Sequence, residues 1–133
     1  MNITQKRLLF VDDEEAIRIT LAAILRRYGL SVTVSASVAE ALHEIKNQNF
    51  DLLLCDLNIG EERDGLDVAR VMRGVNPDCV TIILTGYPDM ESVAEAKRLG
   101  IDDYISKPYK PDMLVALLAE KLAARERLSV AQS

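Results

Sequence analysis

The chain is 133 residues long, a length that favours one folded domain and leaves little room for a second. Its 49% hydrophobic and 28% charged residues are typical of a globular protein with one buried core, which excludes a disordered, collagen-like or disulfide-scaffold protein. The 21 acidic side chains outnumber the 16 basic ones, and the formal charge of -5 argues against direct binding of nucleic acid.

No segment of the sequence is suited to cross a membrane. The longest apolar runs, such as Leu52 to Cys55 and Ile82 to Leu84, are far shorter than the roughly 20 residues that span a bilayer. Residues 1–7 are polar and contain no apolar signal region, so we expect a cytoplasmic protein.

The two cysteines are predicted to be structural. Cys55 and Cys79 lie in apolar stretches and lack the spacing of a zinc or redox site, which indicates buried thiols. They fall at opposite ends of two predicted parallel strands, roughly 16 Å apart, whereas a disulfide needs Cα atoms within roughly 7 Å. We therefore expect no disulfide.

Five short apolar runs, separated by segments of helical periodicity, predict strands. In chain order they are Leu8–Val11, Ser31–Val34, Leu52–Cys55, Val80–Leu84 and Tyr104–Ile105. The third and fourth runs are apolar nearly throughout, which is typical of central strands covered by helices on both faces.

Apolar residues at spacings of three and four predict a helix after each strand. The first helix ends at Gly29, the second opens with a capping box at Ser37 and Glu40, the fourth stops at Gly100 and the fifth begins at Pro111. The apolar faces are Ile17 to Tyr28, Val38 to Ile45, Leu66 to Met72, Met90 to Ala94 and Leu114 to Leu122. Beyond them, residues 123–133 predict a frayed helix end or the start of a linker.

Alternating strands and helices joined by right-handed crossovers predict a doubly wound α/β sandwich, with helices on both faces of a parallel sheet. Open sheets of this kind bind ligands at the C-terminal ends of their strands. The polar residues expected at that edge are Asp12, Asp13, Asp56, Thr85 and Lys107.

These residues bring carboxylates, a hydroxyl and an ammonium group to one edge. Carboxylates this close repel each other, and a hard divalent cation relieves the repulsion, so we predict an Mg²⁺ site with open positions for phosphate oxygens. Lys107 adds positive charge, Thr85 a hydrogen-bond donor, and Asp56 a nucleophile able to form an acyl phosphate. Taken singly, each of these motifs also has a purely structural interpretation. An Asp-Asp pair after a strand is often a helix cap, and a Lys-Pro pair is usually part of a loop.

Four segments at the strand ends carry a more specific signal. They are Phe10-Val11-Asp12-Asp13-Glu14, Leu54-Cys55-Asp56-Leu57, Ile83-Leu84-Thr85-Gly86 and Asp103-Tyr104-Ile105-Ser106-Lys107-Pro108. Together they resemble the receiver domain of bacterial two-component response regulators, over about residues 6–125. The resemblance implies a flavodoxin-like (βα)5 three-layer sandwich with strand order 2-1-3-4-5, followed by a tail or linker at residues 126–133.

The same resemblance implies that Asp56 accepts a phosphoryl group from the histidine of a sensor kinase or phosphotransfer protein. Asp12, Asp13 and Asp56 would hold the Mg²⁺ together with the backbone carbonyl of Asn58. The expected function is a signalling switch whose only chemistry is its own phosphorylation and dephosphorylation.

The resemblance also assigns the parts that respond to phosphorylation. Thr85 would turn to bond the phosphoryl oxygen, Lys107 would pair with it, and Tyr104 would move inward as Thr85 moves. The change would reach the surface of the fourth helix, fifth strand and fifth helix, which would control an output domain or effector, or form a homodimer. The peptide bond before Pro108 is expected to be cis.

Two features depart from the family pattern. Gly60 stands where a proline is usual, and Asp64-Gly65 arrives one residue late, so Gly60 to Arg63 predict a longer, more acidic and mobile loop.

Tyr87, two residues after Thr85, occupies a position that in the family tunes loss of the phosphoryl group.

Two other functions compete with the switch. A small-substrate aspartyl phosphohydrolase would need a second acid two residues after the nucleophile, where this chain has Asn58. A receiver-like interaction module that no longer takes phosphate is disfavoured by the complete set of acidic, hydroxyl and lysine residues.

His43, the only histidine, is expected on the surface and not in phosphoryl transfer.

Overall fold

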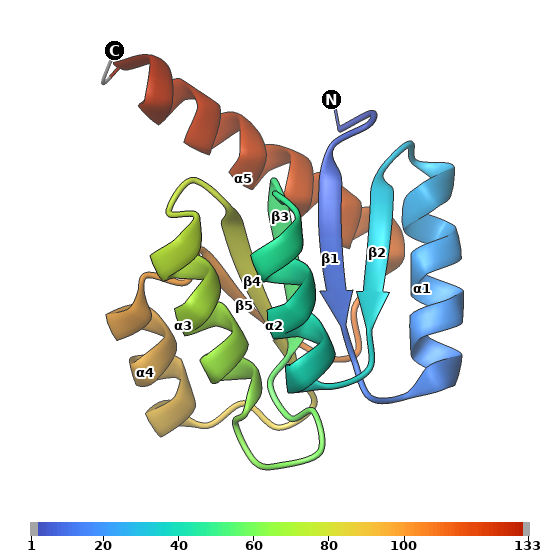
Figure 1. Ribbon diagram of the computed structural model, residues 1–133, viewed down its shortest axis with the longest axis vertical. Helices are drawn as coiled ribbons and strands as arrows, with labels where there is room; N and C mark the ends of the chain where they lie inside the picture. Colours follow the sequence, from blue (N-terminus) through green and yellow to red (C-terminus); the bar gives the residue numbers. More distant parts are fainter. Residues whose placement is uncertain (1–2, 132–133) are drawn as a thin grey trace.

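A five-stranded parallel sheet lies between two layers of helices (Figure 1). The computed structural model describes residues 3–131. The strands are β1 (Arg7–Val11), β2 (Ser31–Ser35), β3 (Leu52–Asp56), β4 (Val80–Thr85) and β5 (Asp103–Ser106). Their order, β2-β1-β3-β4-β5, confirms the predicted doubly wound sandwich.

Five helices cover the two faces of the sheet. Their bounds are α1 (Glu15–Arg27), α2 (Val38–Asn47), α3 (Gly65–Val75), α4 (Met90–Leu99) and α5 (Pro111–Ala131). The core is split by the sheet into one cluster under α1 and α5 and another under α2, α3 and α4. All six side chains of β4 are buried, as expected of a central strand.

Successive side chains of the central strands point to opposite faces of the sheet. Leu52 and Leu54 pack with the helices α1 and α5, whereas Leu53 and Cys55 pack with the layer of α2, α3 and α4. The first four residues of β3 are buried, and its last residue, Asp56, lies half-buried at the edge of the core.

The predicted boundaries change at several strand and helix ends. Each strand gains one or two residues, and Asp56 and Thr85 are the last residues of β3 and β4, at the strand ends where they were expected. The Glu40 N–H donates to Ser37 Oγ as predicted, but the Glu40 carboxylate accepts from the Ala36 N–H instead of the Ser37 N–H. The chain turns into the left-handed region at Gly100, with φ of 77°, and α4 ends there.

The last helix is longer than its apolar face predicts. It continues through residues 126–131, and Figure 1 shows its end extending past the sheet. Arg125 anchors this extension because its guanidinium bonds to the Asp102 carboxylate and to the Pro77 carbonyl. The proposed domain boundary at residue 125 therefore falls inside a helix.

Cys55 and Cys79 are both buried and free, as predicted. Burial raises the pKa of the Cys55 thiol well above its ordinary value and that of Cys79 to about 12.

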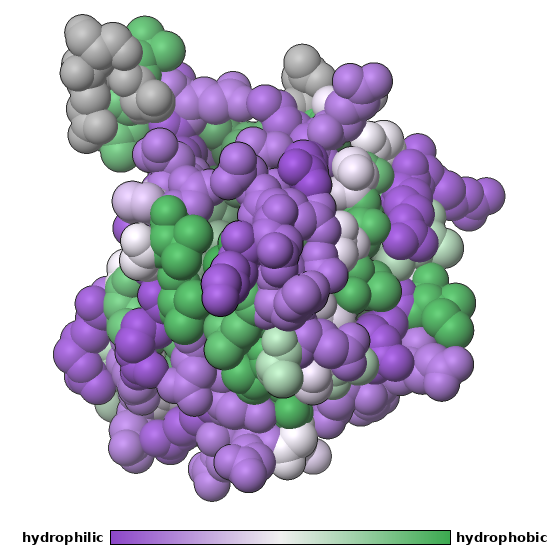
Figure 2. Space-filling view, viewed as in Figure 1, coloured by the Kyte–Doolittle hydropathy of each residue, from purple (hydrophilic) through white to green (hydrophobic). Residues whose placement is uncertain are grey.

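His43 is exposed on α2. None of the helices within residues 3–131 is long and apolar enough to cross a membrane. Figure 2 shows a face that is mostly polar, with smaller apolar patches between the polar residues.

Candidate functional site

The candidate site is built at the C-terminal ends of neighbouring strands. Asp12 directly follows β1, which pairs with β3 in a register that sets Val11 opposite Cys55. The next residues along these two strands are Asp12 and Asp56, so two carboxylates meet at adjacent strand ends. The next strand, β4, ends in Thr85 opposite Ser106 of β5, and Lys107 follows.

Lys107 lies between the two carboxylates. Its Nζ is 2.7 Å from Asp56 Oδ2 and 3.7 Å from Asp12 Oδ2, and we call these three residues the acceptor cluster. Burial lowers the pKa of Lys107, but the hydrogen bond to Asp56 and the charges of both carboxylates outweigh it, so the pKa is raised. The Lys107–Pro108 peptide bond is cis, as expected.

Asp12 is the most deeply buried member of the acceptor cluster. Its Oδ1 accepts the Glu14 N–H at 2.8 Å, while Oδ2 has no hydrogen-bond partner within residues 3–131. Desolvation raises the pKa of Asp12 to about 6, with the neighbouring charge of Asp56 acting in the same direction. This oxygen lies within ion-pair distance of Lys107 Nζ but accepts no hydrogen bond, so a divalent cation would give it a direct partner and add positive charge between the two carboxylates.

The acidic residues do not form a complete metal cage. Asp13 is exposed, and among the described residues no three His, Cys, Asp or Glu side chains are grouped as metal ligands. Mg²⁺ usually keeps several waters and binds through one or two carboxylates, so the open oxygen of Asp12 beside Asp56 still fits this ion. The Asn58 N–H donates to Asp56 Oδ1 at 3.1 Å, which places Asn58 beside the same carboxylate.

Thr85 is buried at the end of β4 and its hydroxyl faces the loop that follows. Its Oγ1 accepts the Tyr87 N–H at 3.1 Å, and its carbonyl accepts the Lys107 N–H at 2.7 Å. Thr85 therefore links the acceptor cluster to the β4–α4 loop. The Tyr87 side chain is exposed.

Tyr104 is half-buried against the α2, α3 and α4 layer. Its hydroxyl lies 2.7 Å from the Ser92 Oγ on α4, and Ser92 is itself fully buried. Sequence analysis singled out Tyr104 but missed Ser92. The signal available was Asp89 followed by Ser92 three residues later, a helix-capping arrangement whose cap is Asp89.

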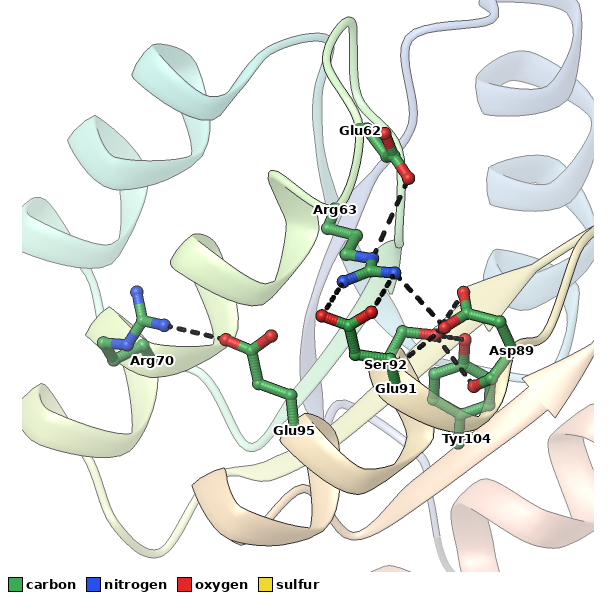
Figure 3. Close-up of polar contacts among 8 residues, drawn as sticks. All are labelled: Glu62, Arg63, Arg70, Asp89, Glu91, Ser92, Glu95 and Tyr104. Carbon is green, nitrogen blue, oxygen red and sulfur yellow. Dashed lines mark hydrogen bonds and ion pairs between the residues drawn. The ribbon is translucent and has the colours of Figure 1, made fainter.

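Side-chain hydrogen bonds hold the β3–α3 loop at several points, while the mobility that its sequence predicted stays a prediction. The Asp64 carboxylate accepts the N–H groups of Ile59 and Glu61 at 2.5 and 3.2 Å, and Asn58 Oδ1 accepts the Arg63 N–H at 2.7 Å. Gly60 and Arg63 adopt positive φ values of 109° and 62°. The Arg63 side chain reaches across to α4 (Figure 3).

Gly65 is a further residue whose role the sequence did not reveal. A Cβ atom there would lie 2.0 Å from the Asp56 carbonyl oxygen, so only glycine allows α3 to begin this close to β3. The Gly65 N–H donates to the Leu57 carbonyl at 2.8 Å. The start of α3 therefore packs directly on the backbone of Asp56.

The fold and this site define a flavodoxin-like α/β protein with an acidic pocket and a lysine at the C-terminal edge of its sheet. A family model described as the response regulator receiver domain matches residues 8–119. Over 116 residues the chain is 36% identical to the transcriptional regulatory protein ZraR of Escherichia coli (strain K12), a match that covers 87% of this chain and 26% of ZraR.

Solved structures agree with this match. A CheY-like response regulator receiver domain protein from Methanospirillum hungatei JF-1 has a TM-score of 0.88 and 32% identity, covering 93% of this chain and 98% of that one. A response regulator protein from Burkholderia pseudomallei, solved with a phosphorylated aspartic acid, calcium ion and citrate, has a TM-score of 0.80 and 30% identity, covering 94% and 75% of the two chains.

The chain belongs to the response regulator receiver domain family of two-component signalling systems. It spans about a quarter of the length of the curated relatives that it matches, 26% in the case of ZraR.

Proposed function

We propose that Asp56 is the phosphoacceptor of this receiver domain and that a kinase or phosphotransfer histidine is its donor. The observation that carries the proposal is the 2.7 Å contact of Lys107 Nζ with Asp56 Oδ2 at the end of a buried strand. This contact orients the carboxylate and supplies a positive charge where phosphoryl oxygens would arrive. The phosphorylated aspartic acid of the Burkholderia pseudomallei relative supports the same chemistry.

The transfer is a displacement at phosphorus. One Asp56 carboxylate oxygen forms a bond to phosphorus while the bond from phosphorus to the histidine nitrogen breaks, leaving an acyl phosphate on the chain. Lys107 then pairs with a phosphoryl oxygen in place of the free carboxylate. A bound Mg²⁺, held by Asp12, Asp13, Asp56 and the Asn58 carbonyl, would neutralise charge on the phosphoryl oxygens.

The response to the phosphoryl group begins at Thr85. Turning its hydroxyl toward a phosphoryl oxygen removes the acceptor that now holds the Tyr87 N–H. The β4–α4 loop is thereby released, and Tyr104 can exchange its contact with Ser92 for a more buried position. The surface formed by α4, β5 and α5 would then control an output domain or effector, or a homodimer. ZraR is a transcriptional regulatory protein, so the output proposed here is control of transcription through a domain outside this chain.

Phosphorylation by a small acyl phosphate donor with Mg²⁺ tests the proposal. The chain should gain the mass of one phosphoryl group, and Asp56→Asn should abolish the gain because an amide is not a nucleophile toward phosphorus. Asp67→Asn is the matched control, since Asp67 is an exposed acid on α3 and should leave labelling unchanged. Labelling that persists in Asp56→Asn would assign the acceptor elsewhere.

A further inference from the structure

A second charged cluster lies between the β3–α3 loop and the start of α4 (Figure 3). Arg63 Nη2 is 3.3 Å from Asp89 Oδ1, and Arg63 Nη1 is 3.1 Å from Glu91 Oε1. We call these three residues the α4 clamp. The planar guanidinium fork contacts both carboxylates at once, a geometry that the single ammonium group of lysine does not match.

One end of the clamp is tied to the phosphoacceptor. Asp56 Oδ1 accepts the Asn58 N–H at 3.1 Å, and Asn58 Oδ1 accepts the Arg63 N–H at 2.7 Å. Arg63 adopts the left-handed φ of 62°, a conformation that is unfavourable for a residue with a Cβ atom. Contacts of its backbone with Asn58 and of its side chain with α4 hold Arg63 in this conformation. The position of the Arg63 side chain therefore depends on the position of the loop beside Asp56.

The other end of the clamp is tied to Tyr104. Asp89 caps α4, and its carboxylate accepts the Ser92 N–H at 2.8 Å and the Ser92 hydroxyl at 2.9 Å. Ser92 Oγ in turn lies 2.7 Å from the Tyr104 hydroxyl. Hydrogen bonds and one ion pair therefore run from Asp56 through Arg63 to Tyr104, along a route that does not include Thr85.

The positive charge of Arg63 favours the ionised forms of the Asp89 and Glu91 carboxyl groups. The hydrogen bond from Arg63 holds the pKa of the Glu91 carboxyl below its usual value. The Ser92 hydrogen bonds, followed by the charge of Arg63, lower the pKa of Asp89. Both acids are ionised at neutral pH, so the attraction to Arg63 is fully present.

We propose that Arg63 is a positioning residue that holds the first turn of α4, and with it Tyr104, in the arrangement in which Thr85 Oγ1 accepts the Tyr87 N–H. Asp89 ends the β4–α4 loop, and in this proposal the release of that loop by Thr85 moves Asp89 away from Arg63. Contacts present in only one of two conformations stabilise that conformation, so the α4 clamp opposes the switch. The proposed effect of Arg63 on phosphorylation rests on the proposed function, in which Asp56 is the phosphoacceptor. The proposed hold of Arg63 on α4 does not depend on that function.

Hydrogen exchange of the unphosphorylated chain tests the hold on α4. In Arg63→Ala, which keeps a Cβ atom at the left-handed position, the Ser92 and Val93 amides should exchange about fivefold faster, because the cap loses its anchor. Arg70→Ala is the matched control. Arg70 of α3 also pairs with an acid of α4, at 3.3 Å from Glu95, but it does not contact the cap of α4. Its effect at the same amides should be less than about twofold.

Binding of beryllofluoride with Mg²⁺, a mimic of the phosphoryl group, tests the link to Asp56. Arg63→Ala should bind the mimic about threefold to fivefold more tightly, and Arg70→Ala should match the unsubstituted chain. Arg63→Glu should likewise bind more tightly, and adding Glu91→Arg should return both affinity and exchange toward the original values. A role in general stability would not produce this rescue.

Each outcome decides a different point. Unchanged exchange in Arg63→Ala overturns the hold on α4, and so does an equal change in Arg70→Ala. Faster exchange with unchanged or weaker mimic binding overturns the opposition to the switch. If the unsubstituted chain binds no mimic, the proposed function fails, while the exchange comparison still decides whether Arg63 holds α4.

Discussion

The acceptor cluster and the α4 clamp have the same composition, two acids and one cation, and yet they differ in what they can do. Asp12 of the acceptor cluster is completely buried and leaves one oxygen without a hydrogen bond, whereas Glu91 of the clamp is exposed and paired. Desolvation raises the pKa of Asp12, whereas the bond with Arg63 lowers the pKa of Glu91. Burial therefore distinguishes a site that is open to a cation and a phosphoryl group from a clamp whose two carboxylates are already paired with Arg63.

The largest effect is expected where the backbone supports the acceptor cluster. Gly65→Ala should lower the free energy of unfolding by about 3 kcal/mol, because the new Cβ atom collides with the Asp56 carbonyl and pushes α3 away. Gly74→Ala, in the same helix but with nothing within 4 Å of a Cβ atom, should instead raise it by about 0.5–1 kcal/mol. Urea denaturation of both variants measures the difference, and equal effects would contradict the close packing of α3 on β3.

The pH dependence of stability should distinguish the two clusters by sign. Without divalent metal, folded Asp12 keeps its proton up to about pH 6, whereas an unfolded aspartate releases it near 3.8. The folded chain binds more protons in this interval, so the free energy of unfolding falls as pH rises through it. Asp12→Asn should remove this fall and raise stability at neutral pH by on the order of 2 kcal/mol.

The matching change in the clamp should act in the opposite direction. The pKa of Glu91 is lowered from 4.5, so its ion pair stabilises the fold above that pH and is lost as pH falls through the folded pKa. Glu91→Gln should therefore reduce stability at neutral pH and have no effect in acid. Denaturation curves across pH measure both variants, and shifts of the same sign would show that burial does not separate the clusters.

The smallest expected effect concerns the exposed edge of the acceptor cluster. Asp13→Ala should weaken Mg²⁺ binding about tenfold, because the ion would lose one of few carboxylates, with little change in fold stability. Glu15→Ala removes the same charge from the first turn of α1 and should leave the affinity unchanged. Titration with Mg²⁺ measures both, and an unaltered affinity in Asp13→Ala would exclude this residue as a ligand.

Local patterns in the sequence were sufficient to predict the elements and the edge of the sheet where the chemistry lies. Apolar runs placed every strand to within one residue at either end. The signal was clearest for the central strands, because a strand buried on both faces needs an unbroken apolar segment. The polar residues that follow those runs, such as Asp12 and Lys107, then had to meet, since parallel strands end at the same edge. The approach of Lys107 to Asp56 follows from that topology.

The contacts around the β3–α3 loop could not be predicted in this way. Its acidic, glycine-containing sequence is typical of a solvated and mobile segment, and nothing near Arg63 in the chain indicates a partner on α4. The pairing depends on the left-handed backbone at Arg63 and on the packing of α3 and α4 side by side. Asp89 is 26 residues away from Arg63 along the chain, beyond the range of any local pattern.

The sequence by itself determined the parallel sheet, its helices and the residues at its chemical edge, because periodicity and burial are encoded locally. Only the tertiary structure decided that Asp12 keeps an oxygen without a hydrogen bond, that Gly65 packs on the Asp56 carbonyl and that Arg63 pairs with Asp89 at the start of α4. The physical reason is that desolvation, close backbone approach and ion pairing depend on distances between segments far apart in the chain.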